Sequence, residues 1–101
     1  MKKIIDGKMY NTETAVCVGT NGYSYPGNFN WFEESLYQKK SGEFFVFGEG
    51  GAKSKFRKQI DTNAWSGGED IFPLTENEAK KWCEENISAE EYIELFGEPD
   101  E

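Results

Sequence analysis

The sequence predicts an α+β fold, an antiparallel sheet of four or five strands with two C-terminal helices packed against it. Two observations predict it: aromatic-rich runs at 31–38 and 43–48 flank a short turn, and two helix-start motifs follow each other after residue 74. The 101 residues contain no repeat and no linker, so we expect a single domain that covers residues 1–101.

The N-terminal part alternates short apolar runs with turn residues. Runs at 3–5 and 8–10 flank Asp6-Gly7, a dipeptide that favours a tight hairpin turn. Residues 15–18 predict a further short strand. The Gly-Thr-Asn-Gly sequence at 19–22 is typical of a turn, and we expect it to end that strand.

The run at 43–48 predicts the central strand. Its side chains alternate, so Phe44 and Val46 point to one face of the sheet while Phe45 and Phe47 point to the other. Both faces of this strand are therefore apolar, which indicates that it is central or covered on both sides.

The rest of the chain is predicted to be a loop, one strand and two helices. The stretch from 53 to 68 has no firm periodicity and is expected to be a loop with one helical turn, and a last short strand at 69–74 is stopped by Pro73. Each helix begins with a capping box, in which a hydroxyl and a glutamate three residues later bond each other's backbone amides. The capping boxes are Thr75 with Glu78 and Ser88 with Glu91. The apolar stripe of the first helix consists of Ala79, Trp82, Cys83 and Ile87, and that of the second consists of Tyr92, Ile93 and Phe96. Gly97 and Pro99 end the second helix.

The charge of the chain is divided unevenly along its length. The net charge is −8, but residues 1–60 carry nine bases and six acids, whereas residues 61–101 carry two bases and thirteen acids. The first part is therefore net +3 and the second net −11. Such asymmetry favours a surface that meets a charged partner, and the alternative is that the acids only keep a small protein soluble.

Six glutamates near the C-terminal end are the candidate partner-binding residues. Glu90, Glu94 and Glu98 recur every four residues, so the spacing predicts a ridge of like charges on one helix face. Carboxylates near a helix C-terminus are also disfavoured by the helix dipole. Such a ridge makes sense if a basic partner offsets the repulsion, and the alternative is a solvated face. The six residues are Glu84, Glu85, Glu90, Glu91, Glu94 and Glu98.

A short basic segment offers an alternative binding site. Its four cations, Lys53, Lys55, Arg57 and Lys58, surround Phe56. Cations beside a stacking platform are typical of proteins that bind single-stranded nucleic acid, and the expected platform residues are Trp31, Tyr37, Phe45 and Phe47. This segment keeps open a nucleic-acid-binding module or a small nuclease.

Several catalytic and metal sites are excluded or disfavoured. Without histidine the chain can form no Ser/His/Asp or Cys/His site. Cys17 and Cys83 match no zinc spacing, and we expect both to be buried, reduced thiols. A two-metal site has only weak support, from Asp61, Glu69 and Asp70. The sequence therefore predicts a protein that is not an enzyme, with no catalytic residues, no metal and no cofactor.

Nucleotide-binding and membrane functions are not indicated either. The segment 48–54 ends in Lys-Ser, but Phe47 and Ala52 stand where a phosphate-binding loop needs glycine. No apolar run approaches the roughly 20 residues that span a bilayer, and Lys2-Lys3 leads into no signal-like stretch. We expect a cytoplasmic protein without a membrane partner.

Several short motifs are spread over nearly the whole chain. They are the opening Lys-Ile-Ile-Asp-Gly-Lys-Met-Tyr-Asn-Thr-Glu-Thr-Ala at 3–15, Glu-Ser-Leu-Tyr at 34–37, Phe-Gly-Glu-Gly-Gly at 47–51, Pro-Leu-Thr at 73–75, Glu-Tyr-Ile at 91–93 and Phe-Gly-Glu at 96–98. On these motifs the chain resembles small acidic proteins of Firmicutes mobile genetic elements, among them type II-A anti-CRISPR proteins. These motifs look structural and carry no reaction signature.

The resemblance implies an inhibitor of the RNA-guided effector nuclease of type II CRISPR systems, acting in the bacterial host cell. Its acidic surface would compete with guide RNA or target DNA for basic channels of the nuclease. The resemblance assigns no contact residue. The net basic first part departs from a uniformly acidic nucleic-acid mimic and favours a more specific docking surface. A further alternative is an accessory interaction protein of a mobile element with another target.

Overall fold

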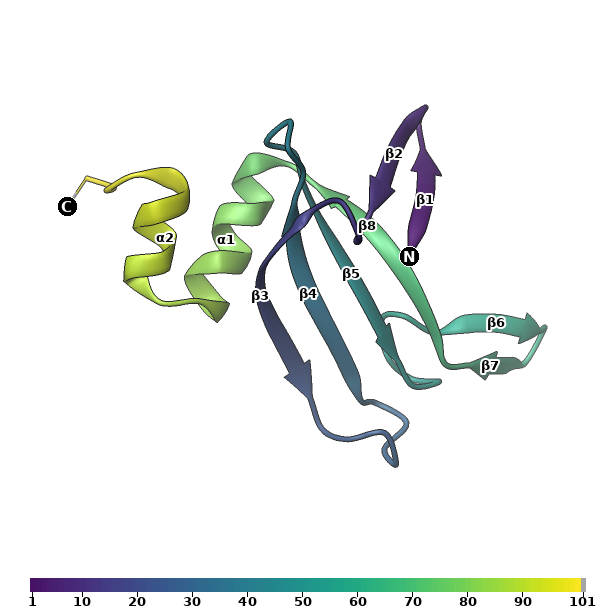
Figure 1. The fold of residues 1–101 in the computed structure, drawn as a ribbon. Coiled ribbons are helices and arrows are strands. Elements are labelled where there is room, and N and C mark those ends of the chain that lie inside the picture. Colours follow the sequence, from purple (N-terminus) through teal and green to yellow (C-terminus); the bar gives the residue numbers. More distant parts are fainter. Residues whose placement is uncertain (101) are drawn as a thin grey trace.

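The computed structural model describes residues 1–100 and contains eight strands and two helices (Figure 1). A four-stranded antiparallel sheet has the order β3-β4-β5-β8, and two separate hairpins pair β1 with β2 and β6 with β7. The strands are β1 (Lys2–Ile5), β2 (Lys8–Asn11), β3 (Val16–Tyr23), β4 (Phe32–Gln38), β5 (Phe44–Gly50), β6 (Lys58–Asp61), β7 (Ala64–Ser66) and β8 (Gly68–Leu74), and the helices are α1 (Glu76–Asn86) and α2 (Ala89–Phe96). The predicted α+β fold is confirmed.

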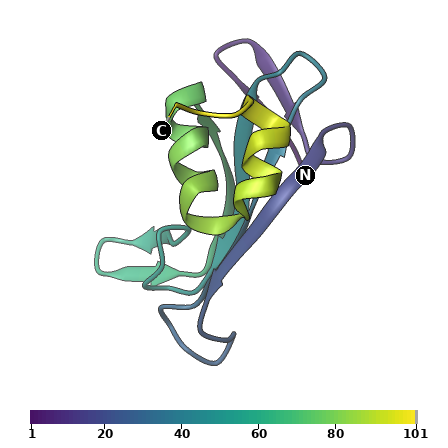
Figure 2. The same ribbon diagram turned by 90° about the vertical axis from the view of Figure 1, so that its left-hand side faces the viewer.

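The central sheet is covered on both faces. Helices α1 and α2 lie side by side over one face (Figure 2), where Leu36, Phe44 and Val46 pack against Ala79 and Cys83 of α1. We call this side the helix face. On the other side, the hairpin face, Phe45 and Ile71 pack against Tyr10 of the β1–β2 hairpin. The prediction that the strand at 43–48 is covered on both sides is therefore confirmed.

Local turn and cap signals have the predicted geometry. Asp6 and Gly7 have φ angles of 51° and 77°, as a turn that matches the twist of a hairpin requires. Both capping boxes form: the Thr75 hydroxyl accepts the Glu78 amide at 3.1 Å, and Ser88 and Glu91 repeat the arrangement. Helix α2 ends at Gly97, whose φ of 87° lies in the region that favours glycine.

The predicted turn at 19–22 is wrong, because β3 continues through it to Tyr23. A bulge between Cys17 and Gly19 shifts the register, and Thr20 and Asn21 then pair with β4. A side chain at Gly19 would lie 2.7 Å from Ile87 Cγ2. This glycine therefore allows the helices to approach the sheet closely and does not mark a turn.

Two further predictions, about residues 53–68 and about Pro73, are corrected. The stretch expected to be a loop at 53–68 contains the β6–β7 hairpin, which projects away from the sheet (Figure 1). Pro73 does not stop its strand, since β8 continues to Leu74 with Pro73 opposite Phe45. β8 is an edge strand, where a residue without an amide hydrogen is tolerated.

The two cysteines differ in exposure. Cys83 of α1 is fully buried against the sheet, as predicted, and its burial raises the pKa of the thiol. Cys17 is exposed, which corrects the prediction that both are buried. The reason is that Cys17 lies on β3, an edge strand, opposite Tyr37.

Candidate functional site

The six predicted partner-binding glutamates are all exposed, and none forms an ion pair within residues 1–100. We call them the helix carboxylates. They do not form one cluster. Glu84 lines a groove with Ile87 and Tyr92 between the helices, whereas its neighbour Glu85 lines a different groove between α1 and the sheet.

The predicted ridge of three glutamates, Glu90, Glu94 and Glu98, is shorter than its spacing suggests. Glu90 and Glu94 lie on α2, but Glu98 follows the helix end at Gly97 and is outside the helical repeat. Glu91 has a structural role, since its Oε1 accepts the Ser88 hydroxyl at 3.0 Å. On α2 the unengaged pair of the ridge is therefore Glu90 and Glu94.

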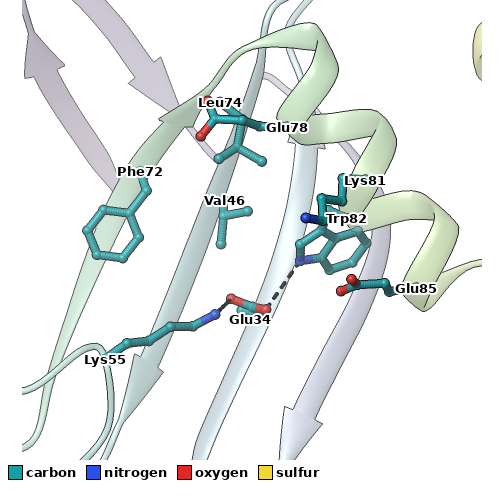
Figure 3. Close-up of a pocket in the computed structure, with 9 residues that line it drawn as sticks. All are labelled: Glu34, Val46, Lys55, Phe72, Leu74, Glu78, Lys81, Trp82 and Glu85. Carbon is teal, nitrogen blue, oxygen red and sulfur yellow. Dashed lines mark hydrogen bonds and ion pairs between the residues drawn. The ribbon is translucent and has the colours of Figure 1, made fainter.

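Lys55 of the basic segment is engaged in an ion pair with a buried carboxylate. Its Nζ lies 2.7 Å from the Glu34 carboxylate, and only 4% of the Glu34 side chain is exposed. The other Glu34 oxygen accepts the Trp82 indole N–H at 3.2 Å (Figure 3). Lys55 therefore fastens the segment to the sheet and to α1, which reduces its value as a nucleic-acid contact.

Phe56 anchors the same segment. Its ring is buried above Gly48 and lies between Phe32 and Phe72, at centroid distances of 6.5 and 5.5 Å. A methyl group at Gly48 would overlap this ring. Gly48 of β5 thus leaves room for an aromatic side chain from a distant segment.

The remaining cations of the segment are exposed. Lys53, Arg57 and Lys58 form no ion pair within residues 1–100, and the Arg57 guanidinium lies 4.7 Å from the centre of the Trp65 ring. The aromatic platform expected beside them does not form. Phe45 is fully buried, and Tyr37 and Phe47 are half-buried and pack into the core of the hairpin face, while Trp31 lies in a groove near the sheet end.

Three glutamates that sequence reasoning missed form a row across the hairpin face. Glu33 of β4 is the register partner of Glu49 of β5, which is also the register partner of Glu69 of β8. All three are exposed, and none forms an ion pair within residues 1–100. We call them the glutamate row. Its sequence signal is the placement of Glu33 and Glu49 at equivalent exposed positions on either side of the predicted hairpin turn.

Comparisons of the chain with known protein families, with curated proteins and with solved structures found no match. Neither helix of residues 1–100 has the length and apolar character that a membrane span requires. Across the same residues, no three cysteine or acidic side chains are grouped so that they would hold a metal ion.

The weak two-metal candidates are not brought together. Asp61 lies on the projecting β6–β7 hairpin, whereas Glu69 and Asp70 are neighbours on β8 and point to opposite faces. Asp70 forms an ion pair with Lys3 of β1. Partial burial raises the pKa of Asp70, but the hydrogen bonds from Lys3 and from the Ile71 amide outweigh it and hold the pKa below its ordinary value.

Proposed function

We propose that this protein is an anti-CRISPR inhibitor that binds the effector nuclease of a type II system. In this proposal it has no catalytic residues and no cofactor, and it acts in the cytoplasm of the bacterial host. Its acidic surface competes for a basic channel of the nuclease and blocks guide-RNA assembly or DNA binding.

The observation that supports the proposal best is the glutamate row. Adjacent strands lie about 4.8 Å apart, and like charges that are directly opposite each other destabilise a sheet. The row places three carboxylates at this spacing, and none of them forms an ion pair within residues 1–100. A series of closely spaced negative charges resembles a phosphate backbone, and a basic partner would remove the repulsion.

The helix carboxylates do not form one cluster, but they add a second set of exposed negative charges on the other side of the sheet. Glu84, Glu85, Glu90 and Glu94 are exposed on α1 and α2. The only bases in the two helices are Lys80 and Lys81, and neither forms an ion pair within residues 1–100. Electrostatic complementarity at such surfaces raises the association rate and selects the partner.

A cleavage assay tests the proposal. The purified protein is added to a type II nuclease before or after guide loading, and cleavage of a matched DNA target is followed. Inhibition only when the protein is added first indicates interference with assembly, and inhibition in both orders indicates a block of DNA binding. Absence of inhibition in either order would overturn the proposal.

Two triple variants, each of which replaces three carboxylates by neutral amides, then separate the acidic surfaces. One is Glu33→Gln, Glu49→Gln, Glu69→Gln, and the other is Glu90→Gln, Glu94→Gln, Glu98→Gln. If a surface contacts the nuclease, its variant should need about tenfold more protein for half-inhibition, equivalent to about 1.4 kcal/mol. If both variants inhibit like the wild type, the acidic-surface mechanism is wrong.

A nucleic-acid-binding role for the basic segment is the second candidate. It is favoured by the Arg57–Trp65 stack together with the exposed Lys53 and Lys58. A gel shift with guide RNA in the absence of the nuclease tests it, with Arg57→Gln as the variant expected to weaken binding. A pull-down with the nuclease distinguishes the inhibitor from an accessory protein with another target.

A further inference from the structure

A groove of about 520 Å³ lies at the end of the central sheet, where β5 finishes and β8 begins. Two aromatic side chains, Phe29 and Trp31, and two carboxylates, Glu49 and Glu69, line it. Glycines at 50–51 and 67–68 supply much of the rest of the lining. Its lining thus combines aromatic rings, negative charge and bare backbone.

The glycines let the chain segments around the groove pack closely against each other. A side chain at Gly51 would lie 2.9 Å from the Trp31 ring, and one at Gly67 would lie 2.7 Å from the Gly50 carbonyl oxygen. Hydrogen bonds hold the aromatic wall in place: the Gly51 amide donates to the Trp31 carbonyl at 2.9 Å, and the Lys53 amide donates to the Phe29 carbonyl at 2.8 Å. The groove is therefore a preformed surface.

The aromatic and acidic groups of this groove are available to a ligand. Phe29 is 67% exposed, and Trp31 is partly exposed. Glu49 and Glu69 are register partners on adjacent strands and are both exposed. Neither carboxylate has a cationic partner within residues 1–100, and no cation lines the groove. Two negative charges and two aromatic side chains thus line the same groove.

A guanidinium group fits this combination better than other common groups. It is planar, stacks on aromatic rings, and donates hydrogen bonds in a fork that two carboxylates can accept. A phosphate or an acidic peptide would be repelled by Glu49 and Glu69. A purely apolar side chain would desolvate the carboxylates without replacing their hydrogen bonds.

We propose that this groove binds an arginine side chain of the protein partner. The inference rests on the proposed function, in which the partner presents a basic nucleic-acid channel, and it names the residue type that enters the groove. Glu49 and Glu69 belong to both the groove and the glutamate row, so an arginine bound here lies beside two of the three carboxylates of the row.

Titration of the ¹⁵N-labelled chain with N-acetyl-arginine amide, followed by NMR, tests the inference without the nuclease. Saturable shifts are expected at the amides of Gly50, Gly51, Gly67 and Gly68 and at the Trp31 indole. The lysine analogue should bind several-fold more weakly, because an ammonium group is more strongly hydrated and cannot stack.

Three variants make the test specific to the groove. Glu49→Gln with Glu69→Gln should weaken arginine binding about tenfold, and Phe29→Leu about fivefold, equivalent to about 1 kcal/mol of cation–π attraction. The matched control Glu90→Gln with Glu94→Gln removes the same charge elsewhere and should leave binding unchanged. The unaffected amide signals of each variant report that its fold is retained.

Two results would overturn the inference: arginine shifts spread over all acidic surfaces without saturation at the glycines, or equal weakening by the control variant. The outcomes for the groove and for the proposed function are separable. If arginine binds the groove but the protein does not inhibit the nuclease, the proposed function fails and the groove assignment stands. If the protein inhibits but arginine does not bind, only the groove assignment fails.

Discussion

The buried carboxylate of Glu34 accepts a hydrogen bond from the indole N–H of Trp82, with 3.2 Å between the two atoms. The same carboxylate pairs with Lys55 at 2.7 Å and accepts the side-chain amide of Asn21 at 3.4 Å. One side chain of β4 therefore connects α1, the basic segment and β3. It holds the helix face together where α1 and the basic segment meet (Figure 3).

We predict that Glu34→Ala lowers the free energy of unfolding by about 2–3 kcal/mol, because it leaves the Trp82 N–H and Lys55 without their partner. Urea denaturation measures the change. Glu33→Ala is the matched control, since Glu33 is adjacent in sequence but exposed on the opposite face. The control should change stability by less than about 0.5 kcal/mol. Equal effects of the two substitutions would contradict this role of Glu34.

Gly48→Ala is expected to destabilise the fold by about 1–3 kcal/mol, because the added methyl group overlaps the buried Phe56 ring. Thermal or urea unfolding measures the loss. In a Phe56→Ala background the same Gly48→Ala change should cost much less, since the space above β5 is then empty. Additive costs in the double variant would show that the two residues do not share this space.

Sequence reasoning succeeded where a signal is local. The Asp6-Gly7 turn and the boxes at Thr75 and Ser88 depend on residues within a few positions, and they have the predicted geometry. The turn predicted at Gly19 is wrong because glycine is common both in turns and where two segments of the chain approach closely. Here the deciding contact is with Ile87, which is distant in the sequence.

In the candidate site, too, local patterns could be predicted from the sequence, whereas contacts between distant segments could not. Exposure of the helix carboxylates follows from the apolar stripes of the two helices, and it could be predicted. The glutamate row joins three strands, and only the register of both strand pairs places Glu49 between Glu33 and Glu69. Lys55 looked available in a basic run, and its pairing with Glu34 depends on tertiary packing.

The Lys3–Asp70 ion pair joins the β1–β2 hairpin to β8 and should make stability depend on pH. The folded-state pKa of Asp70 lies below its ordinary value of 3.8, so the contribution is present above about pH 4 and is lost as the pH falls through the folded pKa. Asp70→Asn should therefore cost up to about 1 kcal/mol at pH 7 and nearly nothing at pH 2, as measured by urea unfolding.

Lys3→Met provides the control for that pair. It removes the partner and leaves the carboxylate, so its cost should also disappear at low pH. A constant difference between either variant and the wild type from pH 7 to pH 2 would show that the ion pair does not cause the effect.

The glutamate row makes the opposite kind of prediction, namely a substitution that stabilises. Glu49 has a like-charged register partner on both sides, whereas Glu33 and Glu69 are at the ends of the row. Glu49→Gln removes two repulsions at once and should raise the free energy of unfolding by about 0.5–1 kcal/mol, and Glu33→Gln by about half as much.

Salt decides whether that gain is electrostatic. At 1 M NaCl the screening length is about 3 Å, so the difference between Glu49→Gln and the wild type should largely vanish in urea unfolding. A gain that persists in high salt, or one no larger than that of Glu33→Gln, would show that repulsion along the row is not its source. Suppose that Glu49→Gln is more stable than the wild type and also inhibits the nuclease less. The row then lowers the stability of the unbound protein, and binding of its basic partner restores that stability.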